Sequence, residues 1–513
     1  MSLFIGIDIG TTFCKAVVCS ARGELRYCTT RRNDMLVNGA LAEERCEQWW
    51  DNICSMTREI CAHLGDEAGD IAALGISCAG AMMAVDADGE PLTAAIMQMD
   101  KRSMKQMLQL REMERAGKLS LQNPVTDGVS SLQILMHLKA EHPEIYTSTY
   151  KFMTPNGYIA YKLTGRYTAE MSRWSTSLLM DLKKKCWDAE VCRKTIGDAD
   201  KLPELVASDH VVGTLTEAAA RETGLPRSTK VVAGMLDTST AGLGLGVLGY
   251  NEAYMVLGTF GKLCVVSDEN ALDDKRFANF TYVDNDLYIK YMAIDGGCGL
   301  AVNWFKDCFG AEENAQAEAQ GKSVYALLDE KAAGVRPGCD GLVFLPYLTG
   351  GKSPTWNLNA KGVFFGITKG CTKGHFFRAV LESIAYSARM NLELYEQSTG
   401  TRVERVKICG GGSKSPVWAQ LVADILGRPL ELMESQDSEA CGAAYIAIKS
   451  VCGYPDYSWV PSECVRRIEP IPANAELYNA YFPVYKELFS SLASPFRALT
   501  AAKAKADSLN QSQ

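Results

Sequence analysis

A strand–turn–strand pattern occurs twice in this chain, on an offset of 248 residues from Gly10 to Gly258. Residues Leu3 to Asp8 are apolar and β-prone, a Gly-Thr-Thr turn follows, and the chain is apolar again from Lys15 to Cys19. The same order returns at residues 254–257, 258–260 and 263–266. Runs of this kind, separated by a tight turn, predict hairpins. Their repetition predicts two similar halves built on one plan, although one short match alone is also compatible with chance.

Between the two hairpins, strand-like and helix-like segments alternate. A polar, helix-like stretch at 43–64 precedes the apolar stretch Ile71–Ser77, and a short strand is predicted at 230–233, ending at Gly234. Thr214 and Glu217 fit a capping box that would open a helix. Alternation of this kind is typical of an α/β fold, and we expect that fold class here.

The C-terminal half continues the alternation. Six apolar residues fall on one helical face, namely Phe377, Val380, Leu381, Ile384, Ala388 and Leu392. A strand at 403–409 runs into three glycines, and a helix at 418–426 follows. The glycine-rich segment 242–246 is predicted to be a hinge, because glycine permits backbone motion. The small, polar residues from about 498 onward are expected to fray.

Composition excludes several classes of protein. With 513 residues, the chain has room for two to four domains, and 47% hydrophobic with 22% charged residues excludes global disorder. The net charge of −8 argues against a nucleic-acid or anionic-membrane surface. No apolar run reaches membrane-spanning length, and Asp8 interrupts the first apolar stretch, so we expect neither a membrane span nor a secretory signal. The 18 cysteines form no CxxC pair, which favours thiols in a reducing cytoplasm over a zinc site.

The first hairpin carries groups that suit a phosphate ligand. Asp8 ends the strand, Gly10 opens the turn, and Thr11, Thr12 and Lys15 follow. Backbone N–H groups in a turn, hydroxyls and an amine bind phosphate oxygens, and a carboxylate suits the Mg²⁺ that accompanies nucleotides. An ordinary hairpin with the same turn sequence remains an equal alternative at this point.

Two further glycine-rich turns lie in the second half. Gly258-Thr259 repeats the chemistry of the first turn without its carboxylate, and two such loops facing each other would hold a triphosphate from both sides. Gly411, Gly412 and Ser413 follow a strand, and glycines there allow a ligand to approach the backbone closely. The alternatives are a plain hairpin for the first and a loop with unusual turns for the second.

Asp237 is the candidate catalytic base. It follows a predicted strand and Gly234, a placement from which a carboxylate can accept the proton of a substrate hydroxyl during phosphoryl transfer. The alternative is a helix N-cap, since Asp followed by Thr-Ser-Thr-Ala caps a helix well, and the two roles are compatible.

Two other motifs are excluded as nucleotide sites. Residues 244–249 match GxGxxG, but they follow a helix and lead into a strand, the reverse of the dinucleotide fingerprint. Gly351-Lys352-Ser353 resembles the end of a P-loop, yet Pro346 stands where the first glycine is required. Any ATP must therefore be held in another way.

Taken together and in this order, these segments resemble the FGGY family of carbohydrate kinases. The most specific matches are residues 362–367 and 375–382, supported by 340–347, 161–165 and 442–444. The resemblance implies a two-domain α/β architecture of the actin/hexokinase (ribonuclease H-like) ATPase type with a duplicated core. It implies an N-terminal sugar-binding domain at 1–245, a C-terminal nucleotide-binding domain at 246–497 and a polar tail at 498–513.

The same resemblance implies roles for single residues. Asp8 would organise Mg²⁺, Thr11, Thr12 and Lys15 would meet the phosphates of ATP, and Gly258 with Thr259 would form a second phosphate loop. Gly411 and Gly412, next to Ser413, would lie against the adenosine, and Asp237 would deprotonate the sugar hydroxyl. Closure of the domains would exclude water, and a homodimer is common among such kinases.

The chain departs from the family on the sugar side. The loop at 78–82, with Ala79 and Gly80, offers no polar side chain to a sugar hydroxyl. Candidate substrate contacts remain at four positions: Gln98, Asp100, Arg102 and Glu170. The alternative for these residues is surface polarity or an ion pair at a domain interface. We therefore expect a cytoplasmic, ATP- and Mg²⁺-dependent kinase of a ketose (pentulose or hexulose) or polyol, whose substrate has changed with the loop. The alternative function is a non-catalytic sugar or nucleotide sensor.

Overall fold

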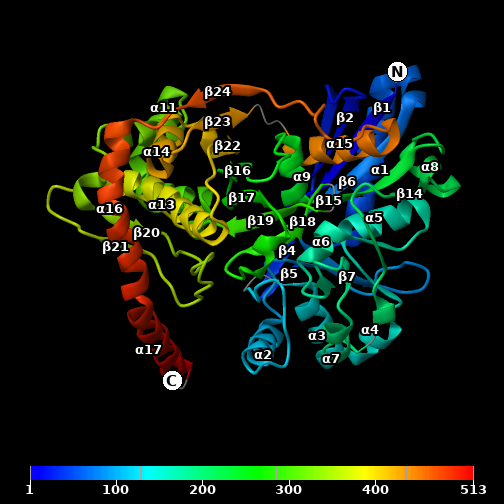
Figure 1. Cartoon of the computed structure of the whole chain (residues 1–513), viewed down its shortest axis with the longest axis horizontal. Coiled ribbons are helices and arrows are strands. Elements are labelled where there is room, and N and C mark those ends of the chain that lie inside the picture. The colour runs from blue at the N-terminus through cyan, green and yellow to red at the C-terminus, as the bar shows by residue number, and fades with distance from the viewer. Residues whose placement is uncertain (1, 127–129, 198, 284–285, 434–436, 512–513) are drawn as a thin grey trace. The chain divides into compact units, whose positions relative to one another are not determined.

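The computed structural model describes residues 2–126, 130–197, 199–283, 286–433 and 437–511. The chain forms two compact units, and each draws on separate stretches of sequence (Figure 1). The first unit comprises residues 1–250, 266–290 and 435–462, and the second comprises 251–265, 291–434 and 463–513. Among the described residues, every helix is too short or too polar to cross a lipid bilayer.

The first unit is built on a six-stranded sheet with the order β14-β15-β6-β1-β2-β3. The predicted hairpin is present, with β1 antiparallel to β2, and β1 pairs in parallel with β6, which in turn pairs in parallel with β15. The strands are β1 Leu3–Ile9, β2 Phe13–Ser20, β3 Leu25–Arg32, β6 Ile71–Cys78, β14 Val211–Thr214 and β15 Lys230–Leu236.

The other large sheet has seven strands in the order β18-β19-β17-β16-β22-β23-β24. Its hairpin, β16 with β17, is antiparallel, and β16 pairs in parallel with β22, which pairs in parallel with β23. This pairing repeats that of the first sheet strand by strand, so the predicted duplication is confirmed. The strands are β16 Ala253–Val256, β17 Lys262–Ser267, β18 Ala278–Thr281, β19 Tyr288–Ala293, β22 Val406–Cys409, β23 Leu430–Met433 and β24 Cys464–Ile468.

Smaller elements complete each unit. In the first unit these are α1 Cys46–Leu64, α2 Met104–Arg115, α3 Ser131–Glu141, α4 Pro143–Ser148, α5 Pro155–Thr164, α6 Met171–Ser175, α7 Ala189–Lys194, α8 Glu217–Thr223, β10 Thr168–Glu170, β11 Met180–Asp181, β12 Cys186–Trp187, β13 Glu204–Val206 and a five-stranded sheet of β4 Leu36–Asn38, β5 Leu41–Glu44, β8 Ala95–Met97, β7 Ala81–Val85 and β9 Lys151–Met153. In the second unit they are α10 Gly299–Phe309, α11 Ala311–Gln320, α12 Val324–Ala333, β20 Val343–Leu345 and β21 Val363–Phe365.

Helix α15 (Ser438–Cys452) packs on β1 and β6 and against α9 (Asp237–Gly244) within the first unit (Figure 1). A Cβ on Gly6 of β1 would lie 1.8 Å from the Ala440 carbonyl oxygen, so glycine is needed for the helix to approach this closely. Gly244, in the segment predicted to be a hinge, is likewise needed for packing, because its Cβ would lie 2.0 Å from the Ser438 oxygen. The chain passes into the second unit only after Tyr250.

Two local predictions need correction. Strand β15 does not end at Gly234 but continues through it to Leu236, with a register shift against β6 and a φ of +80° at the glycine. Helix α8 is capped by Thr216 rather than Thr214, since the Thr216 hydroxyl accepts from the Ala219 N–H. Both differences arise from backbone paths that a local pattern does not encode.

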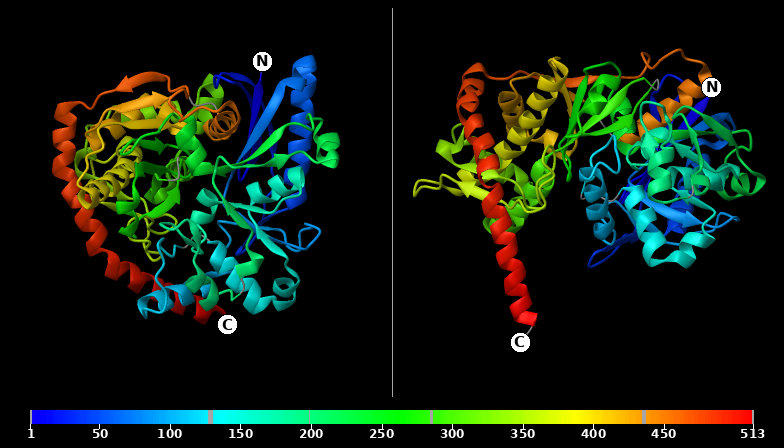
Figure 2. Two further views of the ribbon diagram at one scale, coloured as in Figure 1. Left: turned by 45° about the vertical axis from the view of Figure 1, so that its right-hand side comes forward. Right: turned by 60° about the horizontal axis from the view of Figure 1, so that its bottom comes forward.

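The second unit has α13 (Lys373–Thr399) at its core, and all six residues predicted on its apolar face are buried. Helices α14 (Pro416–Leu426) and α16 (Pro472–Ser491) pack beside it, and α17 (Ala493–Gln511) follows α16 (Figure 2). The expectation of a frayed tail is therefore wrong for the described residues. The reason is the alanine-rich composition of this segment, which favours a helix.

Candidate active site

The first glycine turn joins β1 to β2 and holds Asp8 beside Lys15, which are paired in the antiparallel register. The Gly10 N–H donates to the Phe13 oxygen over 3.0 Å, and a Cβ on Gly10 would lie 2.8 Å from that oxygen. Thr11 is half-buried and Thr12 is exposed. The turn thus leaves both threonine side chains at the surface of the unit, as a phosphate loop requires.

A chain of hydrogen bonds connects Asp8 to the start of α9. The Ser77 hydroxyl donates to Asp8 Oδ1 over 2.7 Å, and it lies 2.8 Å from the Thr240 hydroxyl. The Thr240 hydroxyl, which has one proton to give either to Ser77 or to the main chain, also lies 3.0 Å from the main-chain oxygen of Asp237. Residues from three distant parts of the sequence are therefore fixed in one place, and the predicted metal carboxylate and the predicted base both belong to it.

Asp237 is the first residue of α9, and the residue in the N-cap position is Leu236. The alternative reading of Asp237 as the N-cap is therefore wrong. Its carboxylate accepts from the Thr238 hydroxyl over 3.0 Å and is only half-buried. Asp8, in contrast, is 7% exposed. Of the two carboxylates, Asp237 is the one that a substrate can approach.

The electrostatics at Asp8 suit a divalent cation. Burial, together with the negative charges of Glu439 and Asp237, raises the pKa of Asp8 to about 7, against the hydrogen bond from Ser77 and the charge of Lys15. Within the described ranges, no group of three or more His, Cys, Asp or Glu side chains is placed to hold a metal ion. Mg²⁺ is usually held by one or two carboxylates together with substrate phosphates, so the oxygen donors here fit it.

Lys15 has a partner that the sequence reasoning missed. Its ammonium lies 2.7 Å from Oδ1 of Asp437, the residue before the first turn of α15, which adopts a φ of +60°. No local motif marks Asp437, because the contact arises only when α15 returns to the first sheet. The pair places a lysine and two acidic residues, Asp437 and Glu439, at one end of this helix.

The second glycine turn is held in its own unit by the start of α10. The Gly299 N–H donates to the Gly258 oxygen over 2.8 Å, and the Leu300 N–H donates to the Thr259 oxygen over 3.1 Å. Gly297 lies against the same turn, since its Cβ would be 3.3 Å from the Thr259 oxygen. The helix that fixes this turn was not anticipated, although the sequence Gly-Gly-Cys-Gly just before it is a visible signal.

The glycine loop after β22 adjoins the second turn. The Gly412 N–H donates to the Leu257 oxygen over 2.8 Å, one residue before Gly258. A Cβ on Gly411 would meet no atom within 4 Å, so the space beside it is open. The Ser413 hydroxyl donates to the Gly410 oxygen over 2.7 Å and is buried, which makes it a support of the loop. The predicted nucleotide loops of this half thus lie together.

On the sugar side, the loop after β6 lies next to Gln98. The Gln98 N–H donates to the Gly80 oxygen over 2.9 Å, and a Cβ on Gly80 would lie 2.8 Å from the side-chain oxygen of Gln98. The Ala79 N–H donates to the Ile9 oxygen over 2.9 Å. The structure therefore brings the candidate substrate loop to the end of the strand that carries Asp8.

Asp100 and Arg102 form an ion pair inside the unit. Asp100 is fully buried, and it accepts from the Ala42 N–H at 2.7 Å and from the Arg102 guanidinium at 2.8 and 2.9 Å. Arg102 also donates to Glu43 over 2.6 Å. Glu170 is likewise occupied, since it caps α6. The carboxylates of Asp100 and Glu170 are thus used by protein donors.

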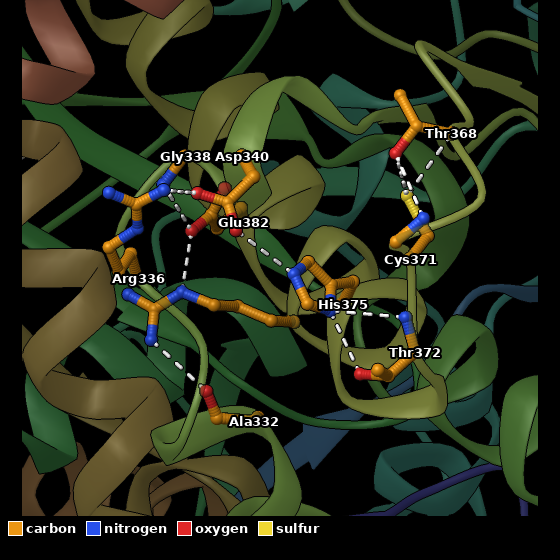
Figure 3. A network of polar contacts seen from close by, with 11 residues as sticks. Ala332, Arg336, Gly338, Asp340, Thr368, Cys371, Thr372, His375 and Glu382 are labelled. Atoms are coloured by element: carbon orange, nitrogen blue, oxygen red, sulfur yellow. Dashed lines mark hydrogen bonds and ion pairs between the residues drawn. The ribbon is translucent and has the colours of Figure 1, made fainter.

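The stretch most specific to the suspected family forms a polar network in the second unit (Figure 3). Glu382, buried on α13, accepts from the Arg378 guanidinium at 2.8 Å and from the Gly338 N–H at 3.0 Å. His375 lies 3.1 Å from Asp340 and forms a capping box with Thr372. These side chains fix the start of α13, so His375 has a structural role.

Comparison with known proteins bears out the resemblance. Residues 3–244 match the model of the FGGY family of carbohydrate kinases, N-terminal domain, and residues 253–451 match its C-terminal domain. A xylulose kinase of Bacillus subtilis is 27% identical over 498 residues, covering 96% of this chain and 97% of the relative. A gluconokinase of Bacillus licheniformis is 28% identical over 503 residues, with 96% and 97% covered. These names are those of enzymes and give the sensor alternative no support.

Solved structures agree on the fold. A xylulose kinase from Lactobacillus acidophilus has a TM-score of 0.88 at 22% identity, covering 97% of this chain and all of the other. A gluconate kinase from the same organism has a TM-score of 0.89 at 21% identity, with 97% and 99% covered. The predicted two-domain α/β architecture with a duplicated core is confirmed. Since the two family models together span most of the sequence, the chain belongs to the FGGY family of carbohydrate kinases.

Proposed function

We propose that this carbohydrate kinase transfers the γ-phosphoryl group of ATP to a hydroxyl of a small ketose (pentulose or hexulose) or polyol, with Asp237 as the general base. The observation that carries the proposal is the hydrogen-bonded chain from Asp8 through Ser77 and Thr240 to the first turn of α9. It holds a buried carboxylate and a more accessible one at the same place. The names of the curated relatives, xylulose kinase and gluconokinase, support a carbohydrate acceptor.

In the reaction, the Asp237 carboxylate accepts the proton of the acceptor hydroxyl as its oxygen attacks the γ-phosphorus. The bond between that phosphorus and the bridging oxygen breaks, and ADP leaves. A half-buried carboxylate on the first residue of a helix suits this role, because an acceptor hydroxyl can reach it. Asp8, which is buried and bonded to Ser77, is too enclosed for it.

The nucleotide is assigned to the glycine turns. Gly10, Thr11, Thr12 and Lys15 meet the phosphates, as do Gly258 and Thr259, while Gly411 and Gly412, supported by Ser413, lie against the adenosine. Asp8 would hold Mg²⁺, which supplies charge neutralisation at the phosphates when bound.

The sugar is assigned to residues 1–245, through the loop at Ala79 and Gly80 and through Gln98, with Asp100 and Arg102 shaping that side. The nucleotide is assigned mainly to residues 246–497, and 498–513 form an appended tail. We place the enzyme in the cytoplasm, where ATP is supplied, as a homodimer, which light scattering on the purified protein would test.

The test is an ADP-release assay over pentuloses, hexuloses, polyols and sugar acids. Asp237→Asn should lower turnover of the best acceptor by about 10²- to 10⁴-fold, the usual contribution of a positioned base, while nucleotide binding measured by calorimetry stays largely intact. Asp66→Asn is the control, because Asp66 is exposed on the turn before β6. Unchanged turnover in Asp237→Asn would remove the base assignment, and no ADP release with any acceptor would remove the kinase reaction.

A further inference from the structure

Arg173, on α6 of the first unit, is a buried cation that the proposed reaction does not use. It is 4% exposed. Its terminal nitrogens donate to the Thr176 hydroxyl over 2.6 Å and to the Ala81 main-chain oxygen over 2.9 Å. The third nitrogen, Nε, is buried without a hydrogen-bond partner. Every acceptor that it does reach is neutral.

No carboxylate in the described part of the chain pairs with this guanidinium within ion-pair distance. The nearest in sequence, Glu170, accepts instead from the Ser172 N–H, the Arg173 N–H and the Ser208 hydroxyl, at 2.7 to 2.9 Å. Burial lowers the pKa of Arg173, yet an arginine remains charged in proteins. The charges of Asp237 and Glu170 favour its ionised form without touching it, and a buried charge with no directly bonded counter-charge is costly. Such groups gather at functional sites.

The position of Arg173 ties it to both sides of the proposed acceptor site. Its bond to the Ala81 oxygen joins it to the loop that carries Ala79 and Gly80. On the other side, the Ser172 hydroxyl accepts from the Leu236 N–H over 2.9 Å, directly before Asp237. The guanidinium is therefore anchored between the substrate loop and the start of the helix that carries the base.

The loop in front of Arg173 is unusually bare. Residues 79–81 are Ala-Gly-Ala, so no side chain longer than a methyl group stands on them. A ligand in that place finds few side-chain donors for neutral hydroxyls. The nearby positive charge is the guanidinium, which feels the charges of Asp237 and Glu170 but makes no direct ion pair with either. Such a combination favours a substrate that brings its own negative charge, because arginine binds carboxylates through paired, charge-assisted hydrogen bonds.

We propose that Arg173 recognises the carboxylate of a sugar acid, so that the preferred acceptor is an aldonate. A hydroxyl at the far end of the aldonate then meets Asp237, and the carboxylate meets the guanidinium. This inference rests on the proposed function and narrows its acceptor from ketoses and neutral polyols to polyhydroxy acids. It adds no chemical step, since the acceptor oxygen still takes the phosphoryl group.

The experiment compares two matched pairs of acceptors, gluconate with glucitol and xylonate with xylitol, which differ by a carboxylate in place of a terminal alcohol. At saturating ATP, the kcat/KM of the wild type should be about 10- to 100-fold higher for the acid than for the alditol in one of the pairs. This factor corresponds to the free energy of hydrogen bonds to a charged group. Arg173→Met should abolish that preference by raising the KM for the acid more than the KM for the alditol, and Arg173→Lys should restore part of it. Arg58→Met is the control, because Arg58 is exposed on α1.

Each other result overturns the inference. If the wild type prefers the alditols, or xylulose, the kinase function stands and the anion site does not. If Arg173→Met slows acid and alditol equally and shifts the acidic limb of the pH–rate profile, the guanidinium serves Asp237 instead. If Arg173→Met does not fold, two measurements on the wild type test the inference: its kcat/KM preference, and its calorimetric affinity for gluconate compared with glucitol. Equal values for acid and alditol would overturn it. If no acceptor releases ADP, the proposed function itself fails.

Discussion

The ammonium nitrogen of Lys15 lies 2.7 Å from Oδ1 of Asp437, although 422 residues separate them in the sequence. Lys15 belongs to the first hairpin, and Asp437 precedes a helix whose chain has just come from the second unit. The predicted phosphate-binding lysine is thus already paired with a carboxylate. An incoming phosphate must compete with that carboxylate for the same ammonium group.

Asp437→Asn should therefore lower the KM for ATP several-fold. The amide oxygen of asparagine still accepts a hydrogen bond from Lys15, but the competing charge is gone. Stability should change by less than about 1 kcal/mol, since the side chains are 35% and 20% exposed. In a Lys15→Met background, the same substitution should leave the KM unchanged. Steady-state kinetics with varied ATP tests this, and a KM that does not respond in the wild-type background contradicts the competition.

The packing of α15 on its neighbours gives a prediction about stability. A Cβ on Gly442 would lie 2.0 Å from the main-chain oxygen of Thr240, on the helix that begins with Asp237. A carbonyl within a helix cannot swing aside, so Gly442→Ala should cost about 2–3 kcal/mol in the free energy of unfolding. Urea denaturation measures this. Gly69→Ala is the control, because no atom lies within 4 Å of the added carbon. Equal stability of the two variants would show that α15 can shift.

The sequence predicted well what depends on local chemistry. Both hairpins, the apolar face of α13 and the glycine loop after β22 follow from periodicity and turn residues, which act over a few positions. It failed where distant segments decide. Gly234 is typical of a strand end, yet β15 continues because its residues after Gly234 still pair with β6. The partner of Lys15 is brought close only when α15 packs against the first sheet. No sequence motif marks Arg173, because what sets it apart is its burial in the folded chain.

A buried carboxylate near the second turn predicts a pH dependence. Asp295 is fully buried, accepts from the Lys352 N–H over 2.6 Å and from the Ser387 hydroxyl, and burial raises its pKa to about 7. The unfolded chain releases this proton near pH 4. The protonated Asp295 carboxyl therefore contributes its full stabilisation of the folded state below about pH 4. This stabilisation is lost as the pH rises to about 7.

Asp295→Asn, which is neutral throughout, should flatten that dependence. Relative to the wild type, the variant should gain about 1 to 4 kcal/mol in unfolding free energy between pH 4.5 and 7.5, the range that such a shift allows. Urea midpoints at several pH values measure the difference. Asp66 is exposed, so the plot of unfolding free energy against pH for Asp66→Asn should be parallel to that of the wild type. A parallel plot for Asp295→Asn would mean that the Asp295 carboxyl is not protonated in the folded state.

Adjacent glycines after β22 separate a ligand contact from a packing contact. A Cβ on Gly411 meets no atom within 4 Å, and its φ is not positive, whereas a Cβ on Gly412 would lie 2.4 Å from the Trp418 ring. If the adenosine lies against Gly411, Gly411→Val should raise the KM for ATP by about 10-fold, the loss of one or two good contacts, without changing the melting temperature or the KM for the acceptor. Gly412→Ala should instead lower the melting temperature. An unaltered KM for ATP in Gly411→Val would place the nucleotide base elsewhere, because a valine cannot be added against a bound ring without displacing it.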